Sequence, residues 1–77
     1  MSDSESNQLS NIEIMLNGAP RNLQEPVNVA TLLSQMQLDG MRLAVEVDGS
    51  IVPRSQYVNR LLENGAVVEV ITAVGGG

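Results

Sequence analysis

The chemistry of this chain is expected at its C-terminal end, where three glycines follow an apolar, β-branched run. Residues 66–72 have the composition of a buried strand, and a strand cannot continue through three glycines without a large entropic cost. Order is therefore expected to stop near Val74. The sequence predicts a flexible tail, residues 75–77, that presents the α-carboxylate of Gly77.

A tail of this composition is suited to entering a narrow cleft. Five extended residues from Ala73 reach at most about 17 Å, and glycines without a Cβ atom pass a constriction that side chains could not. An α-carboxylate is ionised at neutral pH and is a weak electrophile until a leaving group is attached to it. A partner enzyme must therefore supply the activation. The alternative is an inert, frayed end.

Catalysis by side chains is poorly supported by the composition. The chain has no histidine, cysteine or lysine, so its serine and threonine hydroxyls and the phenol of Tyr57 have no activating base. Glu46 and Asp48 lie two residues apart on an expected strand, a spacing more typical of a solvated face than of an acid and base pair. Residues 75–77 also lack the Lys-Ser/Thr of a phosphate-binding loop. We expect a protein that is not an enzyme and holds no metal.

Length and charge narrow the possible partners. Seventy-seven residues with 43% hydrophobic content suffice for one small domain. Nine acidic residues against four arginines give a net charge of −5, which opposes binding to nucleic acid or to an anionic membrane and favours a basic partner surface. The chain shows neither a secretory signal nor an apolar stretch of membrane-spanning length. We therefore expect a cytoplasmic protein.

Composition also divides the chain into three parts. Residues 1–11 are mostly Ser, Asn, Gln, Asp and Glu, too polar to compensate the entropy lost on ordering, and predict a disordered acidic lead. Residues 12–74 carry the alternating apolar patterns of a folded domain. Residues 75–77 form the glycine tail.

The first half of the domain predicts a hairpin and a helix. Residues 12–16 alternate as a strand, Asn17–Gly18 is a hairpin turn signal, and Arg21–Glu25 is short and polar enough to be the returning edge strand. Asn28 is a candidate N-cap for a helix that stops at Asp39–Gly40. Its apolar positions have the spacing i, i+3, i+4 and i+7: Val29, Leu32, Leu33 and Met36.

The second half predicts the remaining strands. Leu43–Val47 alternates as a third strand, Asp48–Gly49 turns the chain, and Ile51–Val52 is a brief apolar strand halted by a proline. The stretch Arg54–Leu62 has the pattern of a short helical turn at most. Asn64–Gly65 then turns the chain into the final strand.

This order of elements predicts an α+β fold, in which a mixed sheet of four to five strands is crossed on one face by one main helix. The other face is left to solvent. By the period of two, Met15, Ala44 and Ile71 lie on this open face, and with Val74 at the start of the tail they form a candidate partner-binding patch. Scattered exposed apolar residues are also normal on a protein surface, so the patch competes with a reading in which nothing binds there.

Four stretches carry a resemblance to a known family. They are Ile-Met-Leu-Asn-Gly at 14–18, Val-Ala-Thr-Leu-Leu at 29–33, Ala-Val-Glu-Val-Asp-Gly at 44–49 with Ile-Val-Pro-Arg at 51–54, and Val-Glu-Val-Ile-Thr-Ala-Val-Gly-Gly-Gly at 68–77. From about Ile12 to Gly77 the chain resembles the ThiS family, the bacterial sulfur carriers of thiamine biosynthesis. The resemblance implies a ubiquitin-like β-grasp fold. The acidic lead falls outside the family pattern, and Ala66 stands where the family often has Asp.

The resemblance also implies a mechanism and its partners. Gly77 would be adenylated with ATP by an adenylating (activating) enzyme and converted to a thiocarboxylate, whose sulfur enters the thiazole ring of thiamine. Gly75 and Gly76 would form the flexible passage. The implied partners are the activating enzyme, thiazole synthase and a sulfur donor such as a cysteine desulfurase. No cofactor is expected to be bound stably, because the activating enzyme uses the ATP.

Three other readings share parts of this pattern. The small subunit of molybdopterin synthase is also a β-grasp sulfur carrier ending in Gly-Gly, but its tail commonly carries prolines where this chain has Thr72-Ala73-Val74. A protein modifier would join the same carboxylate to lysines of target proteins. A plain binding module would carry an inert tail.

Overall fold

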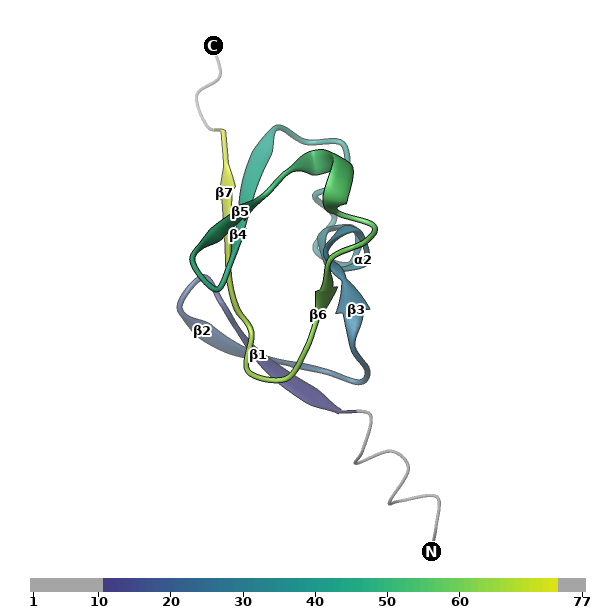
Figure 1. The fold of residues 1–77 in the computed structure, drawn as a ribbon, viewed down its shortest axis with the longest axis vertical. Coiled ribbons are helices and arrows are strands. Elements are labelled where there is room, and N and C mark those ends of the chain that lie inside the picture. The colour runs from purple at the N-terminus through teal and green to yellow at the C-terminus, as the bar shows by residue number, and fades with distance from the viewer. Residues whose placement is uncertain (1–10, 74–77) are drawn as a thin grey trace, which may run out of the picture.

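The computed structural model of the chain describes residues 11–73, which fold into two small sheets, one α-helix and one 3-10 helix (Figure 1). Two segments lie outside the described residues: residues 1–10 of the predicted lead, and residues 74–77, which are Val74 and the predicted tail. In chain order the elements are β1 (Ile12–Leu16), β2 (Ala19–Leu23), β3 (Val27–Asn28), α2 (Val29–Gln35), β4 (Leu43–Val47), β5 (Ser50–Val52), the 3-10 helix η1 (Arg54–Gln56), β6 (Leu61–Leu62) and β7 (Val67–Thr72).

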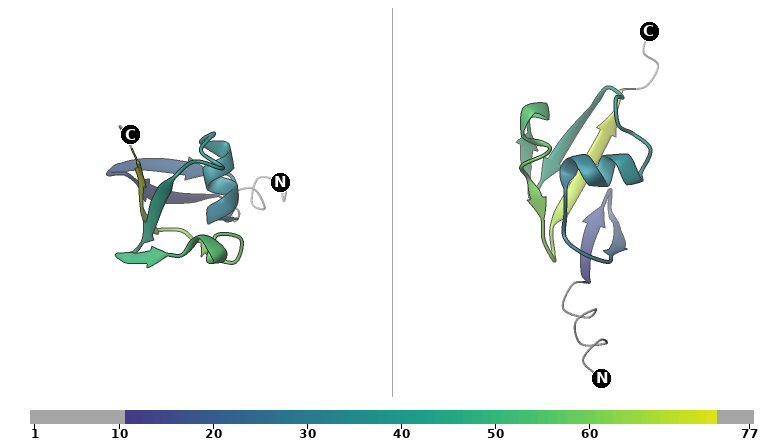
Figure 2. Two further views of the ribbon diagram at one scale, coloured as in Figure 1. Left: turned by 90° about the horizontal axis from the view of Figure 1, so that it is seen from above. Right: turned by 90° about the vertical axis from the view of Figure 1, so that its right-hand side faces the viewer.

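The larger sheet has five strands in the order β2-β1-β7-β4-β5. The hairpins β1–β2 and β4–β5 are antiparallel, and β7 lies between them, parallel to β1 and antiparallel to β4. Helix α2 crosses one face of this sheet (Figure 2). A mixed five-stranded sheet with one covering helix confirms the α+β class expected from the order of elements.

The core lies between α2 and the sheet and is apolar throughout. Within residues 11–73 no charged or polar side chain is buried. The period of two places eight strand residues on the helix side: Ile12, Ile14, Leu16, Leu43, Val45, Val47, Val68 and Val70. All are buried except Leu43, which is half-buried and packs against the core. The buried side chains are Ile12, Ile14, Leu16, Leu23, Val29, Leu32, Leu33, Val45, Val47, Val52, Leu62, Ala66, Val68 and Val70.

Helix α2 begins at the residue that the sequence indicated. The Asn28 side chain accepts a hydrogen bond from the Thr31 backbone N–H at 2.7 Å, which satisfies one of the unpaired donors of the first turn. The C-terminal end was wrong in the sequence reading. The helix stops at Gln35, and the residue in the left-handed conformation is Gln37 (φ 62°).

Two backbone bonds close this helix end. The Leu38 N–H donates to the Leu33 carbonyl at 2.8 Å, and the Gln37 N–H donates to the Ser34 carbonyl at 2.9 Å. This is the hydrogen-bond pair of a Schellman cap. Leu38 packs against the core, so its burial compensates the cost of a left-handed glutamine. Gly40, which the sequence predicted as part of the helix stop, instead has its positive φ of 84° in the turn that follows the helix.

Both hairpins of the large sheet turn through two residues with positive φ. Asn17 and Gly18 have φ values of 52° and 84°, and Asp48 and Gly49 have values of 53° and 86°. These are the angles of type I′ turns, whose twist matches that of the flanking strands. Because the turn is so tight, β2 starts at Ala19 and ends at Leu23, so the expected bounds of the edge strand were wrong.

Three turn side chains complete the hydrogen bonding of the central strands. The Asn17 Oδ1 atom accepts from the Val70 N–H at 2.7 Å. The Asp48 Oδ1 atom accepts from the Val67 N–H at 2.9 Å. In the turn before β7, Asn64 Oδ1 accepts from a β1 N–H at 2.9 Å. Backbone donors left over where a neighbouring strand turns away are thus satisfied by side chains.

The stretch between β5 and β7 holds a strand that the sequence reading missed. Arg54–Leu62 was expected to contain a helical turn at most, and η1 occupies only its first three residues. Leu61 and Leu62 then pair with β3 in a two-stranded sheet. Leu62 is fully buried. Two residues are too few to show a period in sequence, so only the long-range pairing identifies this strand.

The helix packing predicts the effect of a cavity. Leu33 is 4% exposed, so Leu33→Ala should lower the free energy of unfolding by about 2 to 5 kcal/mol. Urea denaturation followed by circular dichroism measures the change. Ser34→Ala, on the exposed side of the same helix, is the control and should change stability little. Equal stability of both variants would contradict the packing of α2.

The Asn17 bond to β7 predicts a second stability effect. Asn17→Gly keeps the left-handed turn but removes the acceptor of the part-buried Val70 N–H. The free energy of unfolding should therefore fall by about 1 kcal/mol. Asn17→Asp retains an oxygen in the same place and is the matched control. In urea denaturation the aspartate variant should have a free energy of unfolding close to that of the parent. An equal decrease in both variants would argue against the Asn17 hydrogen bond to Val70.

Candidate functional site

The base of the predicted tail is held at one end of the large sheet. Strand β7 pairs with β4 as far as the Leu43 and Thr72 partners. The Ala73 N–H then donates to the Arg42 carbonyl at 3.0 Å. Since β1 and β7 are parallel, the chain leaves β7 at the end opposite to the start of β1 (Figure 1). The candidate site residues Val74, Gly75, Gly76 and Gly77 lie outside the described residues.

The open face of the sheet carries the other candidate binding residues. Met15 is 39% exposed and Ile71 is 55% exposed, and Ala44 is exposed directly opposite Ile71. The structure adds Val67, which is exposed opposite Met15. We call Met15, Ala44, Val67 and Ile71 the open-face patch. Sequence reasoning left out Val67, although the period of two along β7 points it to this side.

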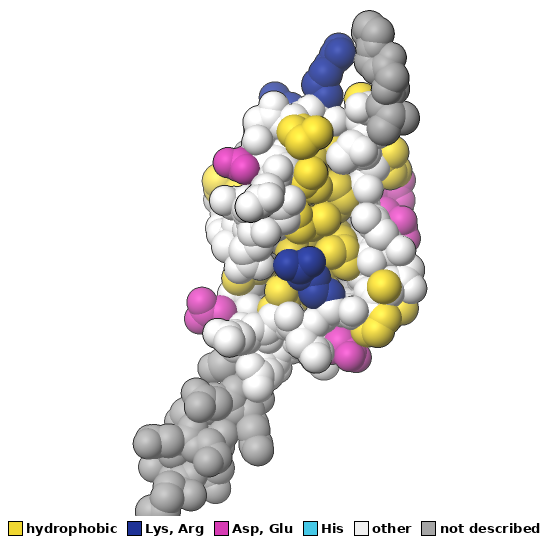
Figure 3. Space-filling view, turned by 180° about the vertical axis from the view of Figure 1, so that it is seen from behind, with side chains coloured by type: hydrophobic (Ala, Val, Ile, Leu, Met, Phe, Trp, Pro, Cys, Tyr) yellow, Lys and Arg dark blue, Asp and Glu magenta, His cyan; other side chains and the backbone are white. Residues whose placement is uncertain are grey.

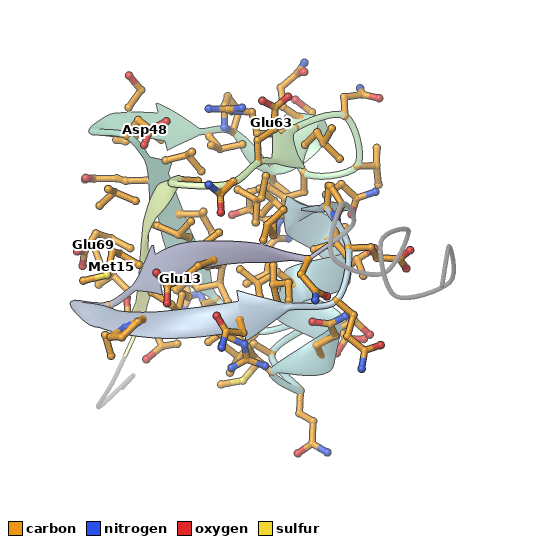
Figure 4. All side chains as sticks on the ribbon, turned by 90° about the horizontal axis from the view of Figure 1, so that it is seen from below. Glu13, Met15, Asp48, Glu63 and Glu69 are labelled. Atoms are coloured by element: carbon orange, nitrogen blue, oxygen red, sulfur yellow. The ribbon has the colours of Figure 1, made fainter. Side chains whose placement is uncertain are left out.

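Acidic side chains accompany this patch. Glu46 and Glu69 are directly paired on β4 and β7, and Glu13 lies two residues before Met15 on β1. Met15 and Glu69 project from the sheet on the side away from α2 (Figure 4). Figure 3 shows the molecule from behind, with apolar and acidic side chains alternating along its right-hand margin. No Lys or Arg side chain is visible on this margin in that view.

Like charges directly opposite in a sheet repel each other, so the Glu46 and Glu69 pair costs stability unless a cation approaches. No arginine lies on this face within the described strands: Arg42, Arg54 and Arg60 lie outside strands, and Arg21 lies in register with the buried Ile14. The open-face patch is therefore an apolar surface with a negative surround, and it is suited to a partner surface that is apolar and basic.

Two of the described side chains that could act as an acid, base or nucleophile make contacts within the fold. Tyr57 is half-buried and packs against the core. Asp48 accepts the Val67 N–H and lies 4.0 Å from Arg60. Among residues 11–73 no group of His, Cys, Asp or Glu has a metal-binding arrangement. The helices in this part of the chain are too short to cross a bilayer.

Position 66, where the family resemblance leads us to expect an acid, belongs to the core in this chain. Ala66 is buried, its N–H donates to the Glu63 carbonyl at 3.0 Å, and its carbonyl accepts from the Met15 N–H at 2.9 Å. A carboxylate at this place would lie at the rim of an apolar core. A methyl group avoids the cost of desolvating it.

Comparison with known proteins agrees with this geometry. The model of the ThiS family matches residues 14–77. Uncharacterized proteins ycf40 of Porphyra purpurea and Pyropia yezoensis are 34% and 37% identical over 67 and 68 residues, which cover 87% and 88% of this chain and 94% and 96% of those proteins. A thiazole synthase of Paramagnetospirillum magneticum is 32% identical over 66 residues, or 86% of this chain, but the match spans only 20% of that longer protein.

A solved structure has the same fold. The crystal structure of thiamine biosynthesis protein ThiS from Geobacter metallireducens superposes with a TM-score of 0.74 at 28% identity, and the match covers 86% of this chain and all of that one. The β-grasp fold expected from the resemblance is therefore confirmed. The family model spans most of the chain, and the chain belongs to the ThiS family, the small sulfur carriers of thiamine biosynthesis.

Proposed function

We propose that this chain carries sulfur as a thiocarboxylate on Gly77 and delivers it for formation of the thiazole ring of thiamine. The observation that carries the proposal is the family match, which runs through the three glycines to Gly77. The described residues support it from another direction. The chain has no His, Cys or Lys to activate a nucleophile, and in this proposal a partner enzyme activates the Gly77 carboxylate.

The proposed chemistry has two steps, and a third when the sulfur donor is a persulfide. A carboxylate oxygen of Gly77 attacks the α-phosphorus of ATP in the activating enzyme, which forms an acyl adenylate and releases pyrophosphate. A sulfur nucleophile then attacks the carbonyl carbon, and AMP leaves. If the donor is a cysteine persulfide, as on a cysteine desulfurase, the product is an acyl disulfide. A thiol reductant then supplies two electrons, breaks the sulfur–sulfur bond and leaves the thiocarboxylate.

The folded body has the task of binding. Ordering three glycines in a cleft costs roughly 3 to 6 kcal/mol, so contacts elsewhere must compensate. The open-face patch, with its apolar centre and the nearby Glu46 and Glu69, is the surface we assign to the activating enzyme and to thiazole synthase. Similarity to part of a thiazole synthase supports the second partner. ATP enters as the co-substrate of the activating enzyme.

The position of the Gly77 carboxylate should decide activation. One residue added after Gly77 moves the carboxylate by about 3.3 to 3.6 Å, more than near-attack geometry tolerates. We expect ATP–pyrophosphate exchange with the cognate activating enzyme to collapse, while circular dichroism stays that of the parent. Gly76→Val should also slow exchange, because a β-branched side chain adds bulk and restricts φ and ψ in the passage.

Intact mass of the protein purified from its native cells gives the second readout. Replacement of one carboxylate oxygen by sulfur is expected, on a chain ending at Gly77. Conjugates of higher mass would indicate a protein modifier instead. If the extended chain is adenylated as well as the parent, or if the parent exchanges with no activating enzyme, the tail is inert and the carrier function is wrong.

The open-face patch predicts a binding defect without unfolding. Met15→Glu and Ile71→Glu should each raise the KM for the carrier in the exchange assay, by about tenfold or more, because a carboxylate would be buried at the interface beside existing acids. Val58→Glu adds the same charge at a residue that is 64% exposed and lies outside the strands of the sheet, and it should leave the KM unchanged. Loss of the circular dichroism signal would place Met15 or Ile71 in the core, and an unchanged KM would show that the patch is not used.

A further inference from the structure

The C-terminal end of β7 has a free edge next to the base of the tail. On its other side β7 is paired with β4 from Val68 to Thr72. On the β1 side, the pairing stops at the Leu16 and Val68 partners, because β1 enters its hairpin turn at Asn17. From Glu69 to Thr72 the central strand therefore has one neighbouring strand instead of two.

The direction of the backbone groups along this edge follows from the observed bonds. The Met15 N–H donates to the Ala66 carbonyl at 2.9 Å, and the Asn17 N–H donates to the Val68 carbonyl at 2.9 Å. Even-numbered residues of this segment therefore turn their backbone groups toward β1. Since the groups alternate along a strand, Thr72 faces the same side.

The odd-numbered residues complete the pattern on the β4 side. The Asp48 N–H donates to the Val67 carbonyl at 2.7 Å. The Ala73 N–H donates to the Arg42 carbonyl at 3.0 Å. These bonds use the other edge of β7, so a partner on the β1 side would not compete with the fold.

Few backbone groups on the β1 side of β7 have no partner within residues 11–73, and they lie close together at Val70 and Thr72. The Val70 N–H is bound by the Asn17 side chain at 2.7 Å. Within residues 11–73, no group accepts the Thr72 N–H or donates to the Val70 and Thr72 carbonyls. Proteins usually protect strand edges with proline, charge or a covering segment. Here the Asn17 side chain protects the first position only.

We propose that an extended segment of the activating enzyme adds to this edge as a further strand, with main-chain hydrogen bonds to Val70 and Thr72. The inference rests on the proposed function, since it concerns how the tail is delivered. Strand addition to an exposed sheet edge is a general mode of recognition, in which backbone bonds provide affinity. The edge fits an extended peptide because its free groups have the spacing of a β-ladder.

The place of the edge in the chain selects the activating enzyme as the occupant. Thr72 is five residues before Gly77, a span of about 17 Å when extended. Bonds that hold Thr72 against the enzyme therefore set the start of the tail, and with it the position of the carboxylate in the ATP site. The free segment is also short, because the turn at Asn17–Gly18 stands at its other end and prevents longer sheet pairing, as between two copies.

The test removes one donor at the edge. Thr72→Pro deletes the Thr72 N–H and leaves every observed bond of β7 in place. Proline is tolerated at edge positions, and the extended conformation it requires of Ile71 is already present. Loss of one net hydrogen bond should raise the KM for the carrier in ATP–pyrophosphate exchange by about 3- to 10-fold.

A matched control exists on β2, the outer strand on the same side of the sheet. Leu16 and Ala19 close a two-residue turn, so the alternation of antiparallel bonds directs the Asn22 N–H outward from β2. Asn22→Pro therefore deletes an equivalent free donor, and it should leave the KM unchanged. If Thr72→Pro alters the circular dichroism spectrum, N-methylation of Thr72 in chemically synthesised chain removes the same donor without the ring.

Amide hydrogen exchange gives an independent readout on the parent chain. The Thr72 amide should exchange rapidly in the free protein and be slowed at least tenfold on addition of the activating enzyme. The edge is not used if the parent is activated but Thr72→Pro and N-methyl Thr72 have the parent's KM. The same conclusion follows if the Thr72 amide of an activated parent stays unprotected on addition of the enzyme. In both cases the proposed carrier function stands. Protection by thiazole synthase alone would also overturn the assignment. A parent that is never adenylated would instead refute the proposed function itself.

Discussion

The rest of the structure depends on the hydrogen bonding of β7 between two hairpins. β1–β2 and β4–β5 are separate local units, and in the large sheet only β7 joins them. Backbone groups that are buried in the middle of a sheet are costly to leave unpaired. Where β1 and β4 turn away from it, Asn17 and Asp48 supply the missing acceptors. The residues that make the tight turns are thus also the residues that hold the central strand.

This arrangement separates the tasks of the two sheet faces. One face buries the apolar side chains under α2, which is enough for a small domain without disulfides or metal ligands in its described part. The other face is free to present apolar residues among carboxylates. A chain of this size has little core to spare for a catalytic cavity. In the proposed function, the reaction is carried out in the partner's site, and this protein contributes a shape to be recognised and a carboxylate.

The same strand links the fold to that task. β7 is paired on its β4 side up to the residue before Ala73, so the C-terminal end of the described chain is held by the sheet. Its other side is free at Val70 and Thr72. A partner that binds both the open-face patch and this edge would contact β7 on two surfaces, and the tail would then enter the partner with few remaining degrees of freedom. The cost of ordering the glycines is correspondingly reduced.

Local sequence patterns determined much of this protein. The alternation at 12–16, 43–47 and 66–72 identified the strands and their buried side, Asn28 marked the start of the helix, and the terminal motifs indicated the family. These features depend on neighbours in the chain, where spacing and side-chain type act directly.

The tertiary structure decided what depends on distant contacts. The helix ends at Gln35 with its left-handed residue at Gln37, and not at Asp39–Gly40, because packing of Leu38 against the core compensates the cost of a left-handed glutamine. β6 forms because Leu61 and Leu62 meet β3, and Val67 joins the open-face patch through its pairing with Met15. The free edge of β7 exists only because β1 stops early beside it. No sequence period records such a difference in strand length, since it arises where two segments more than fifty residues apart lie side by side.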